Sequence, residues 1–347
     1  MDDRQGDVLI LGSSEVQALL TGRELPIIEV VKSAYENHFT GASALPHSTF
    51  LRFPSDSANR IIALPAYLGG EANCAGVKWI ASFPGNLEHG MDRASAVLIL
   101  NSAISGRPKA IMEASTISAK RTAASAALAA QWLGKGTSTS AGFVGCGPIN
   151  FEIARFLLCA CPNLKRLILF DVKPDRARAF REQCEQKLRS VEIEVAATPE
   201  AVFDSTTLIS FGTSAGTPHV HRLSYQPGTV ILHISLRDLS PELILSADNV
   251  VDDVDHVCRA HTSIHLAEQQ CGNRGFIRCT LAEILTGSAS PSRNRNGLTV
   301  FSPFGLGVLD IALAAYVFDH AVKQERGVLM PSFLPGPWTQ LSATAAV

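Results

Sequence analysis

Two kinds of hydrophobic period follow one another along the first third of the chain. Near the N-terminus, apolar side chains recur with helical spacing over 15–20 and 26–39. From Pro46 the period changes to two, which is typical of strands with one buried face. The alternation predicts an antiparallel sheet with a hairpin turn at Ser105-Gly-Arg107, and its strands are expected at 47–53, 60–66, 74–81, 94–100 and 108–113.

A different pattern follows a small-residue helix predicted at 116–133. Short apolar runs now alternate with helical segments, which is typical of a parallel, doubly wound sheet. The sequence therefore predicts an α/β protein in which a Rossmann domain accompanies a second, α+β domain. The expected strands of the Rossmann part include 165–171, 191–196, 208–214, 229–235, 249–253 and 297–301, and long helices are expected at 174–189 and 308–323.

The run Ala141-Gly-Phe-Val-Gly-Cys-Gly147 ends a predicted strand, and helical spacing follows it directly. Gly145 and Gly147 permit a sharp turn and a close approach of backbone N–H groups to an anion, which the start of a helix also favours. Asn150 replaces the third glycine of the dinucleotide fingerprint, so the match is incomplete. Asp171 ends the next strand, where a carboxylate takes the ribose hydroxyls of NAD. The alternative is a βαβ crossover whose glycines serve packing.

Composition narrows the choice of partners. A chain of 347 residues with 46% apolar side chains is long enough for two domains with sizeable cores. Thirty basic and 32 acidic side chains leave a net charge of −2, which excludes a general attraction to nucleic acid. No apolar run is long enough for a membrane span, and the eight cysteines form no C-x-x-C pair. We therefore expect a cytoplasmic protein with reduced thiols and a small-molecule partner.

Lys120 and Arg121 stand in the first turns of the helix predicted at 116–133. The helix dipole disfavours cations there unless an anion lies between them. Their position indicates a bound carboxylate or phosphate, and the alternative is a pair of solvated charges.

Cys258, His261 and His265 have ligand types and a spacing that permit a zinc site. A simpler interpretation is a strand that ends in acidic residues and precedes a polar helix. We therefore predict no metal.

Six short motifs along the chain are Gly76-Val-Lys78, Pro84-x-Asn86, Ser105-Gly-Arg-Pro-Lys-Ala110, Arg121-Thr-Ala-Ala124, Gly145-x-Gly147 and Pro303-Phe-Gly-Leu-Gly307 before Asp310. Together they resemble the ornithine cyclodeaminase/mu-crystallin family over nearly the whole chain. Lys78 with Arg121-Thr122 is the most specific part. Within the family, residues 47–53, 233–239 and 251–258 are similar to the branch that makes 2,3-diaminopropionate for siderophores and peptide antibiotics.

The resemblance implies a domain organisation and an oligomeric state. Residues 1–120 are expected to form a substrate-binding and dimerisation domain that the C-terminal segment 306–347 completes. Residues 121–305 are expected to form the NAD-binding Rossmann domain. A homodimer is expected on the same ground.

The resemblance also implies roles for individual residues. Arg52, Lys78 and Arg121 match the cations that hold an amino acid carboxylate, and Lys78 and Asp238 are expected to be catalytic. Arg93 stands where cyclodeaminases have a small hydroxyl residue, so it is either a cation for an additional carboxylate or a solvated loop arginine. Asp238 is alternatively a helix N-cap. The expected cofactor-binding residues are Thr122, Gly145, Gly147, Ile149, Asn150, Asp171, Thr213, Ser214, Ser235, Phe304 and Gly305.

By this resemblance, the chain oxidises N-(2-amino-2-carboxyethyl)-L-glutamate with NAD to 2,3-diaminopropionate, 2-oxoglutarate and NADH. Alternatives within the family are redox-neutral ornithine cyclodeamination, which gives proline and ammonia, and oxidation of another amino acid or imine. A non-enzymatic alternative is a ligand-binding protein of the crystallin type. The joint presence of Lys78, Arg121 and Asp238 favours an enzyme.

Overall fold

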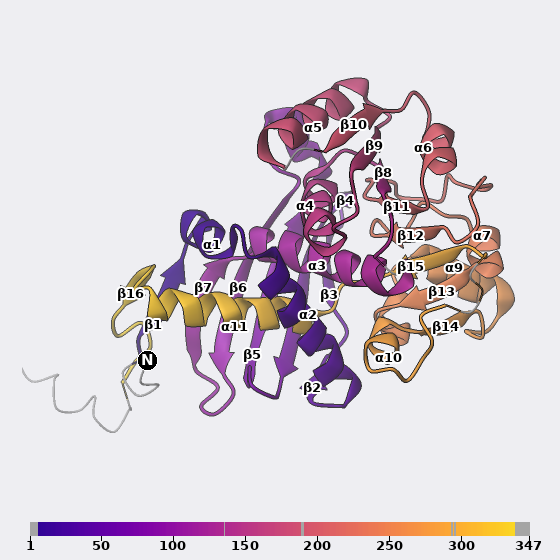
Figure 1. Cartoon of the computed structure of the whole chain (residues 1–347). Coiled ribbons are helices and arrows are strands. Elements are labelled where there is room, and N and C mark those ends of the chain that lie inside the picture. The colour runs from indigo at the N-terminus through magenta and orange to yellow at the C-terminus, as the bar shows by residue number, and fades with distance from the viewer. Residues whose placement is uncertain (1–5, 135, 189–190, 293, 295, 337–347) are drawn as a thin grey trace, which may run out of the picture. The chain divides into compact units, whose positions relative to one another are not determined.

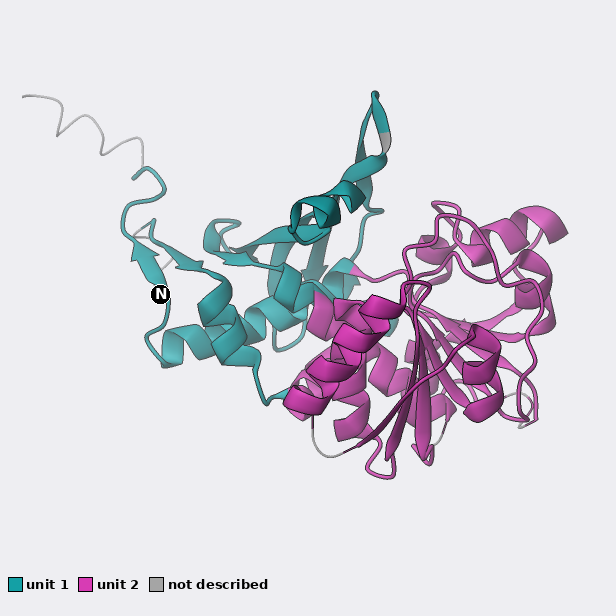
Figure 2. Ribbon diagram, turned by 90° about the horizontal axis from the view of Figure 1, so that it is seen from above, with its two compact units in different colours: residues 1–23, 37–118, 307–347 teal, residues 24–36, 119–306 magenta. Residues whose placement is uncertain are grey.

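The computed structural model of the protein describes residues 6–134, 136–188, 191–292, 294 and 296–336. The chain divides into two compact units, which Figure 2 shows in teal and magenta. Unit 1 contains residues 1–23, 37–118 and 307–347, and unit 2 contains residues 24–36 and 119–306. Within the described residues, no helix is both long and apolar enough to cross a bilayer.

An eight-stranded sheet forms the framework of unit 1, with β3 paired to β4 beside the path β16-β1-β7-β6-β5-β4-β2 (Figure 1). The strands expected from the two-residue period are present and antiparallel, and Gly106 in the predicted hairpin turn has φ 73°. The strands are β1 (Val8–Leu11), β2 (Ser43–Ala44), β3 (Thr49–Phe53), β4 (Asp56–Leu68), β5 (Cys74–Ser82), β6 (Ala94–Ser102), β7 (Pro108–Glu113) and β16 (Val328–Met330).

The expected strands pair in antiparallel fashion as predicted, but the sheet is mixed, because β1, which the sequence did not predict, pairs with β7 in parallel. β1 is a four-residue run, Val-Leu-Ile-Leu, of which Ile10 is half-buried and the rest are buried. It therefore lacks the alternation that reveals a strand with one solvent face.

Helix α11 (Gly307–Lys323) packs on β4, β5 and β6 of this sheet, and α1 (Ser13–Leu20) lies beside it (Figure 1). Gly76 on β5 permits the close approach, since a Cβ there would lie 2.8 Å from Cδ1 of Ile311 on the helix. A Cβ at Gly307 would likewise lie 3.2 Å from Cβ of Ala66. A short 3-10 helix, η1 (Pro84–His89), connects β5 to β6.

Two helices continue from one unit into the other, α2 (Glu24–Phe39) and α3 (Ser115–Leu133). The stretch 24–36, which the sequence predicts within the first domain, groups with unit 2. Its contacts explain the grouping: Glu24 Oε1 lies 2.7 Å from Arg155 Nη2, and the Tyr35 hydroxyl lies 2.7 Å from Ser125 Oγ.

Unit 2 has the predicted doubly wound Rossmann sheet, with eight parallel strands in the order β10-β9-β8-β11-β12-β15-β13-β14. The chain leaves β8 towards β9 on one side and returns to β11 on the other, so the strand order reverses between β8 and β11. Ligands of such sheets bind at this reversal. The strands are β8 (Ser140–Val144), β9 (Arg166–Phe170), β10 (Glu192–Val195), β11 (Leu208–Phe211), β12 (Val230–His233), β13 (Asp248–Val251), β14 (Ile277–Thr280) and β15 (Thr299–Ser302).

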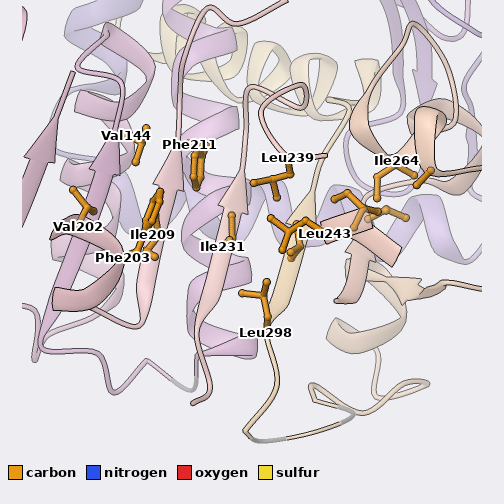
Figure 3. Close-up of a cluster of buried hydrophobic side chains, with 14 of the residues drawn as sticks. Val144, Val202, Phe203, Ile209, Phe211, Ile231, Leu239, Leu243, Ile264 and Leu298 are labelled. Atoms are coloured by element: carbon orange, nitrogen blue, oxygen red, sulfur yellow. The ribbon is translucent and has the colours of Figure 1, made fainter. Parts of the chain in front are cut away.

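Helices cover the faces of this sheet, and their apolar side chains form the core (Figure 3). Val202 and Phe203 of α6 and Leu243 of α7 pack in one cluster with Ile209 and Ile231 of the sheet. Thr280 and Glu283 form a capping box at the start of α10. The helices are α4 (Pro148–Ala160), α5 (Pro174–Lys187), α6 (Pro199–Ser205), α7 (Pro241–Ser246), α8 (Val254–Val257), α9 (Ser263–Cys271) and α10 (Leu281–Leu285).

Candidate active site

The glycine turn of unit 2 joins β8 to α4 at the point where the strand order reverses. Gly145 has φ 92°, and a Cβ there would lie 2.6 Å from the carbonyl oxygen of Gly212 after β11. A side chain is therefore excluded by both the backbone angle and the space. Gly147 is the N-cap of α4, where a Cβ would meet no atom closer than 3.8 Å. The turn thus leaves its outer side open at a helix N-terminus.

Asp171 follows β9 and is tied to this turn. Its Oδ2 accepts a hydrogen bond of 2.8 Å from the Cys146 amide, and its Oδ1 accepts one of 2.9 Å from the Lys173 amide. Arg176 Nε lies 3.8 Å from Oδ2. The carboxylate is therefore fixed beside the turn by backbone donors, in the position that the dinucleotide fingerprint requires.

Asn150 is fully buried on the inner side of the turn. Its Nδ2 donates to the carbonyl oxygens of Gly145 at 2.7 Å and Val144 at 3.2 Å, and its Oδ1 accepts from Ser210 Oγ at 2.8 Å. The side chain thus holds the turn to the sheet, and a contact of Asn150 with the cofactor stays a prediction. Asn150 replaces the third glycine with a side chain that satisfies the backbone of the turn.

Asp238 lies beyond the carboxyl end of β12, is fully buried, and has three side chains close to its carboxylate oxygens. Thr213 Oγ1 donates to its Oδ1, and Ser235 Oγ donates to its Oδ2. His233 Nε2 lies 3.2 Å from Oδ2. The structure thus brings three sequence-predicted residues together, whereas Ser214 is exposed on the following loop.

Burial alone would raise the pKa of Asp238, but the interaction with His233 and the hydrogen bonds from the Ser235 and Thr213 hydroxyls outweigh it and lower the pKa below its usual value. The carboxylate is therefore held ionised. The alternative role as an N-cap is wrong, because Ser240 is the N-cap of α7 and its side chain accepts from the Leu243 amide.

Arg121 is buried on α3 and packs against the turn after β15. Gly305 in that turn has φ 94°, and a Cβ there would lie 2.8 Å from Arg121 Nη1. Asp252 fixes the turn, since its two oxygens accept hydrogen bonds from the Phe304 amide at 2.8 Å and the Gly305 amide at 2.7 Å. Burial raises the pKa of Asp252 to about 6 despite these donors.

Lys120 has a partner within the protein, which corrects one inference from the sequence. Lys120 is 3% exposed, and its ammonium donates to Glu152 Oε2 at 3.1 Å. A cation at this helix start therefore needs no external anion. Thr122 on the same helix is half-buried, as is Ile149 at the start of α4.

Lys78 is the centre of the candidate site in unit 1. Its side chain is 1% exposed, and its Nζ donates to Asp310 Oδ2 at 2.7 Å and to Ser118 Oγ at 3.0 Å. Asp310 comes from α11, which the small residues of the sheet admit close to β5. A buried ammonium requires such a counter-charge.

Arg52 is exposed on β3, and its guanidinium carbon lies 5.5 Å from the ring centroid of Phe50. Arg52 pairs with Arg60 of β4, and Lys78 pairs with Leu64 of the same strand. Residues four apart on a strand share a face and are about 13 Å apart. Arg52 and Lys78 therefore occupy one face of the sheet.

Arg93 is half-buried directly before β6, where its carbonyl oxygen accepts from the Phe83 amide at 2.8 Å. Among the cations expected to bind substrate, Arg93, Arg52 and Lys78 thus belong to unit 1, whereas Arg121 belongs to unit 2.

The residues of the alternative zinc site have other contacts. The His261 amide donates to His265 Nδ1 at 3.2 Å, and Cys258 is buried. Within the described ranges, no three histidine, cysteine or acidic side chains converge in an arrangement for a metal ion.

Three residues of these clusters were not expected to act from their sequence positions: His233, Asp252 and Asp310. Each is a polar residue within or directly after an apolar run, and each is buried and bonded. A polar side chain in such a run is the one signal that identifies them, since a buried charge needs a partner.

A model of the ornithine cyclodeaminase/mu-crystallin family matches residues 9–325 of the chain. The N-((2S)-2-amino-2-carboxyethyl)-L-glutamate dehydrogenase of Staphylococcus aureus is 27% identical over 331 residues, covering 93% of this chain and 98% of that protein. The alanine dehydrogenase of Archaeoglobus fulgidus is 27% identical over 330 residues, covering 92% and 97%.

The structure of an archaeal alanine dehydrogenase dimer with bound NAD has the same fold, with a TM-score of 0.83 and 26% identity. The similarity covers 93% of this chain and 99% of that one. Both units therefore have counterparts in a single known chain.

Proposed function

This chain belongs to the ornithine cyclodeaminase/mu-crystallin family, and we propose that it is the NAD-dependent oxidoreductase that cleaves N-(2-amino-2-carboxyethyl)-L-glutamate. The reaction consumes NAD and water and yields 2,3-diaminopropionate, 2-oxoglutarate, NADH and a proton. The buried, ionised Asp238 at the carboxyl edge of a dinucleotide-type sheet carries the proposal. The dehydrogenase from Staphylococcus aureus aligns with this chain over nearly the full length of both proteins, which supports the choice of substrate.

The residues around the glycine turn fit NAD. Gly145 and Gly147 leave the outer side of the turn without side chains, and the N-terminus of α4 favours a pyrophosphate there. Asp171 is fixed where its oxygens can accept from the adenosine ribose hydroxyls, and its charge disfavours a 2′-phosphate. When bound, NAD supplies the acceptor for the hydride. NAD is expected to give a higher kcat/KM than NADP.

Cations hold the substrate in this proposal. The conjugate has three carboxylates, and arginine and lysine form charge-assisted hydrogen bonds with each of them. Arg52, Lys78 and Arg121 bind carboxylates, and Arg93 binds the one that shorter amino acids lack. In this proposal the Lys78 ammonium contacts both Asp310 and a substrate carboxylate, and the second contact orients the substrate backbone.

Asp238 handles the protons. The secondary amine must be unprotonated before hydride can leave the Cα of the glutamate half, and the resulting imine is then attacked by water that loses a proton. A carboxylate that stays ionised can accept the proton in both steps. The Thr213 and Ser235 hydroxyls donate to it and keep it oriented.

The test is an absorbance assay with the purified protein, NAD and synthetic conjugate. The proposal predicts that NADH accumulates in a one-to-one ratio with 2,3-diaminopropionate and 2-oxoglutarate, both identified by mass spectrometry. Ornithine in place of the conjugate tests the alternative, since cyclodeamination forms proline without net NADH. A protein that binds NAD but turns over neither compound would support the crystallin-type alternative.

We further propose a homodimer that forms through the open face of the sheet in unit 1. Lys78 faces α11, so its neighbour Trp79 lies on the opposite face, where it pairs with Val97. Trp79 is 42% and Val97 37% exposed. Exposed apolar residues on a sheet face are typical of an interface, and the NAD-bound alanine dehydrogenase is a dimer. Light scattering of Trp79→Glu beside the parent protein tests this proposal.

A further inference from the structure

His233 lies in the middle of a buried chain of polar side chains at the carboxyl edge of the sheet in unit 2. It is the last residue of β12 and is fully buried. Its Nδ1 is 3.2 Å from Oγ of Ser302, the last residue of the neighbouring β15. Its Nε2 is 3.2 Å from Oδ2 of Asp238. The chain Ser302–His233–Asp238 therefore connects the ends of adjacent strands.

The imidazole has two possible arrangements of its proton. The Asp238 amide nitrogen also lies 3.2 Å from His233 Nε2, with a geometry suitable for donation. A neutral Nε2 without a proton accepts from this amide, whereas a protonated Nε2 donates to the carboxylate. One nitrogen cannot do both. The choice decides whether Asp238 has a nitrogen donor or faces a nitrogen lone pair.

Resting on the proposed role of Asp238, we infer that His233 is its positioning residue: Nε2 carries the proton and donates to Asp238 Oδ2, while Nδ1 accepts from the Ser302 hydroxyl. A donor to an ionised acceptor is the stronger of the two arrangements. The Ser302 hydroxyl is compatible with this tautomer, because its hydrogen can rotate to Nδ1. His233 thereby fixes the direction in which Asp238 presents its free electron pairs.

Few other ionisable groups lie close to the carboxylate of Asp238. In the part of the chain that the structure describes, the ionisable side chains within 4.0 Å of its oxygens are His233 and His219. His219 Nε2 lies at 4.0 Å and its side chain is 48% exposed. Thr213 and Ser235 are neutral donors, and the Phe211 ring meets the edge of His233 with centroids 6.3 Å apart. The buried imidazole is thus the nitrogen partner within hydrogen-bond distance.

Nitrogen NMR of protein labelled at histidine tests the inference without substrate. The His233 signals are assigned by their loss in His233→Gln. The expected spectrum has a protonated Nε2 and an unprotonated Nδ1 at neutral pH. An unprotonated Nε2 in the parent protein would overturn the inference, because the amide of Asp238 would then be its partner.

Two substitutions at His233 separate positioning from packing. Glutamine reaches as far as Nε2 and can still donate to Asp238, whereas asparagine reaches only as far as Nδ1. We expect His233→Gln to keep kcat within about tenfold and His233→Asn to lose about 100-fold, the range of a charge-assisted hydrogen bond. NADH binding stays unchanged in both. Equal loss in both variants would overturn the inference.

The pH profile supplies a further readout. A donor to the carboxylate lowers the pKa of Asp238, so His233→Asn should move the acid limb of kcat to higher pH, and His233→Gln should move it less. An unmoved limb in His233→Asn contradicts the inference. If the conjugate is not turned over at all, the proposed function fails, but the NMR result still decides the tautomer.

Discussion

The aspartates of the candidate sites in the two units are held by different means. In unit 1, the ammonium of Lys78 meets the carboxylate of Asp310 at 2.7 Å, so one full charge neutralises another. In unit 2, the carboxylates of Asp171 and Asp252 accept from backbone amides, and Asp238 accepts from two hydroxyls and lies 3.2 Å from an imidazole nitrogen. A neutralised pair fixes geometry. A carboxylate held by neutral donors is fixed as well, but it keeps its negative charge for a proton or a ligand.

The same comparison shows which hydrogen-bond donors offset the effect of burial on the pKa of a carboxylate. Backbone amides do not offset the burial of Asp252, and its pKa rises to about 6. The hydroxyls and the imidazole offset the burial of Asp238, and its pKa falls. The donors thus suit the tasks that we propose: Asp252 fixes a turn, whereas Asp238 must remain a base.

The largest expected effect comes from removing the charge of Asp238. Asp238→Asn keeps the size of the side chain but cannot accept a proton, so kcat should fall about 10²- to 10⁴-fold, the usual contribution of a general base. NAD affinity should change little, because the pyrophosphate and ribose contacts that we propose lie at Gly145, Gly147 and Asp171. Steady-state kinetics and NADH fluorescence measure the two quantities. Turnover within a few-fold of the parent would remove Asp238 from the mechanism.

Removing the counter-charge in unit 1 should act on stability. Asp310→Ala leaves the Lys78 ammonium buried without its carboxylate, which costs about 3 to 5 kcal/mol of unfolding free energy. Ser118→Ala is the matched control, since the loss of a neutral hydrogen bond costs about 1 kcal/mol. Urea unfolding of both variants gives the comparison. Equal costs would show that the ion pair contributes no more than a hydroxyl does.

Replacing an exposed or a buried cation of unit 1 should weaken substrate use, by a smaller factor than the loss of turnover in Asp238→Asn. Each charge-assisted contact with a carboxylate contributes about 1.5 to 3 kcal/mol, so Arg52→Ala should raise KM for the conjugate roughly 10- to 150-fold. Arg52 is the cleaner test because it is exposed, whereas Lys78→Ala also leaves Asp310 unpaired. NADH titration of each variant serves as the control. A normal KM in Arg52→Ala contradicts its proposed role.

Local patterns predicted most of the fold. The two-residue period located β3 to β7, and the glycine turn with Asp171 located the switch point of the Rossmann sheet. Both signals lie within short stretches of sequence, so they do not depend on tertiary contacts with distant parts of the chain. β1 escaped prediction because a four-residue apolar run has no period.

The partners of the site residues depend on tertiary structure. Asp310 lies 232 positions after Lys78, and Ser302 lies 69 after His233, so spacing along the chain carries no information about either contact. The exception is Asp238, whose partners Ser235 and His233 are close in sequence. Even there, the sequence indicated the carboxylate but not that the histidine faces it.

The smallest expected effect is on how stability depends on pH. It tests whether Asp252, which backbone amides hold, has a higher pKa than Asp238. Burial raises the pKa of Asp252 to about 6, above the value of about 3.9 in an unfolded chain. The folded state therefore binds this proton more tightly, and the stability that it contributes is present at acid pH and lost as pH rises through 6. Linkage predicts a loss of roughly 1 kcal/mol between pH 5 and pH 7 from this group.

Asp252→Asn removes that titration while keeping an oxygen that accepts from one of the two amides. The difference in unfolding free energy between parent and variant should therefore shrink by roughly 1 kcal/mol from pH 5 to pH 7, because only the parent loses stability there. Urea unfolding at the two pH values measures it. Asp238 has a lowered pKa and titrates below this window, so Asp238→Asn is the control and should give a pH-independent difference. A pH-independent difference for Asp252→Asn as well would mean that the amides of Phe304 and Gly305 keep Asp252 ionised after all, and the contrast between the two carboxylates would disappear.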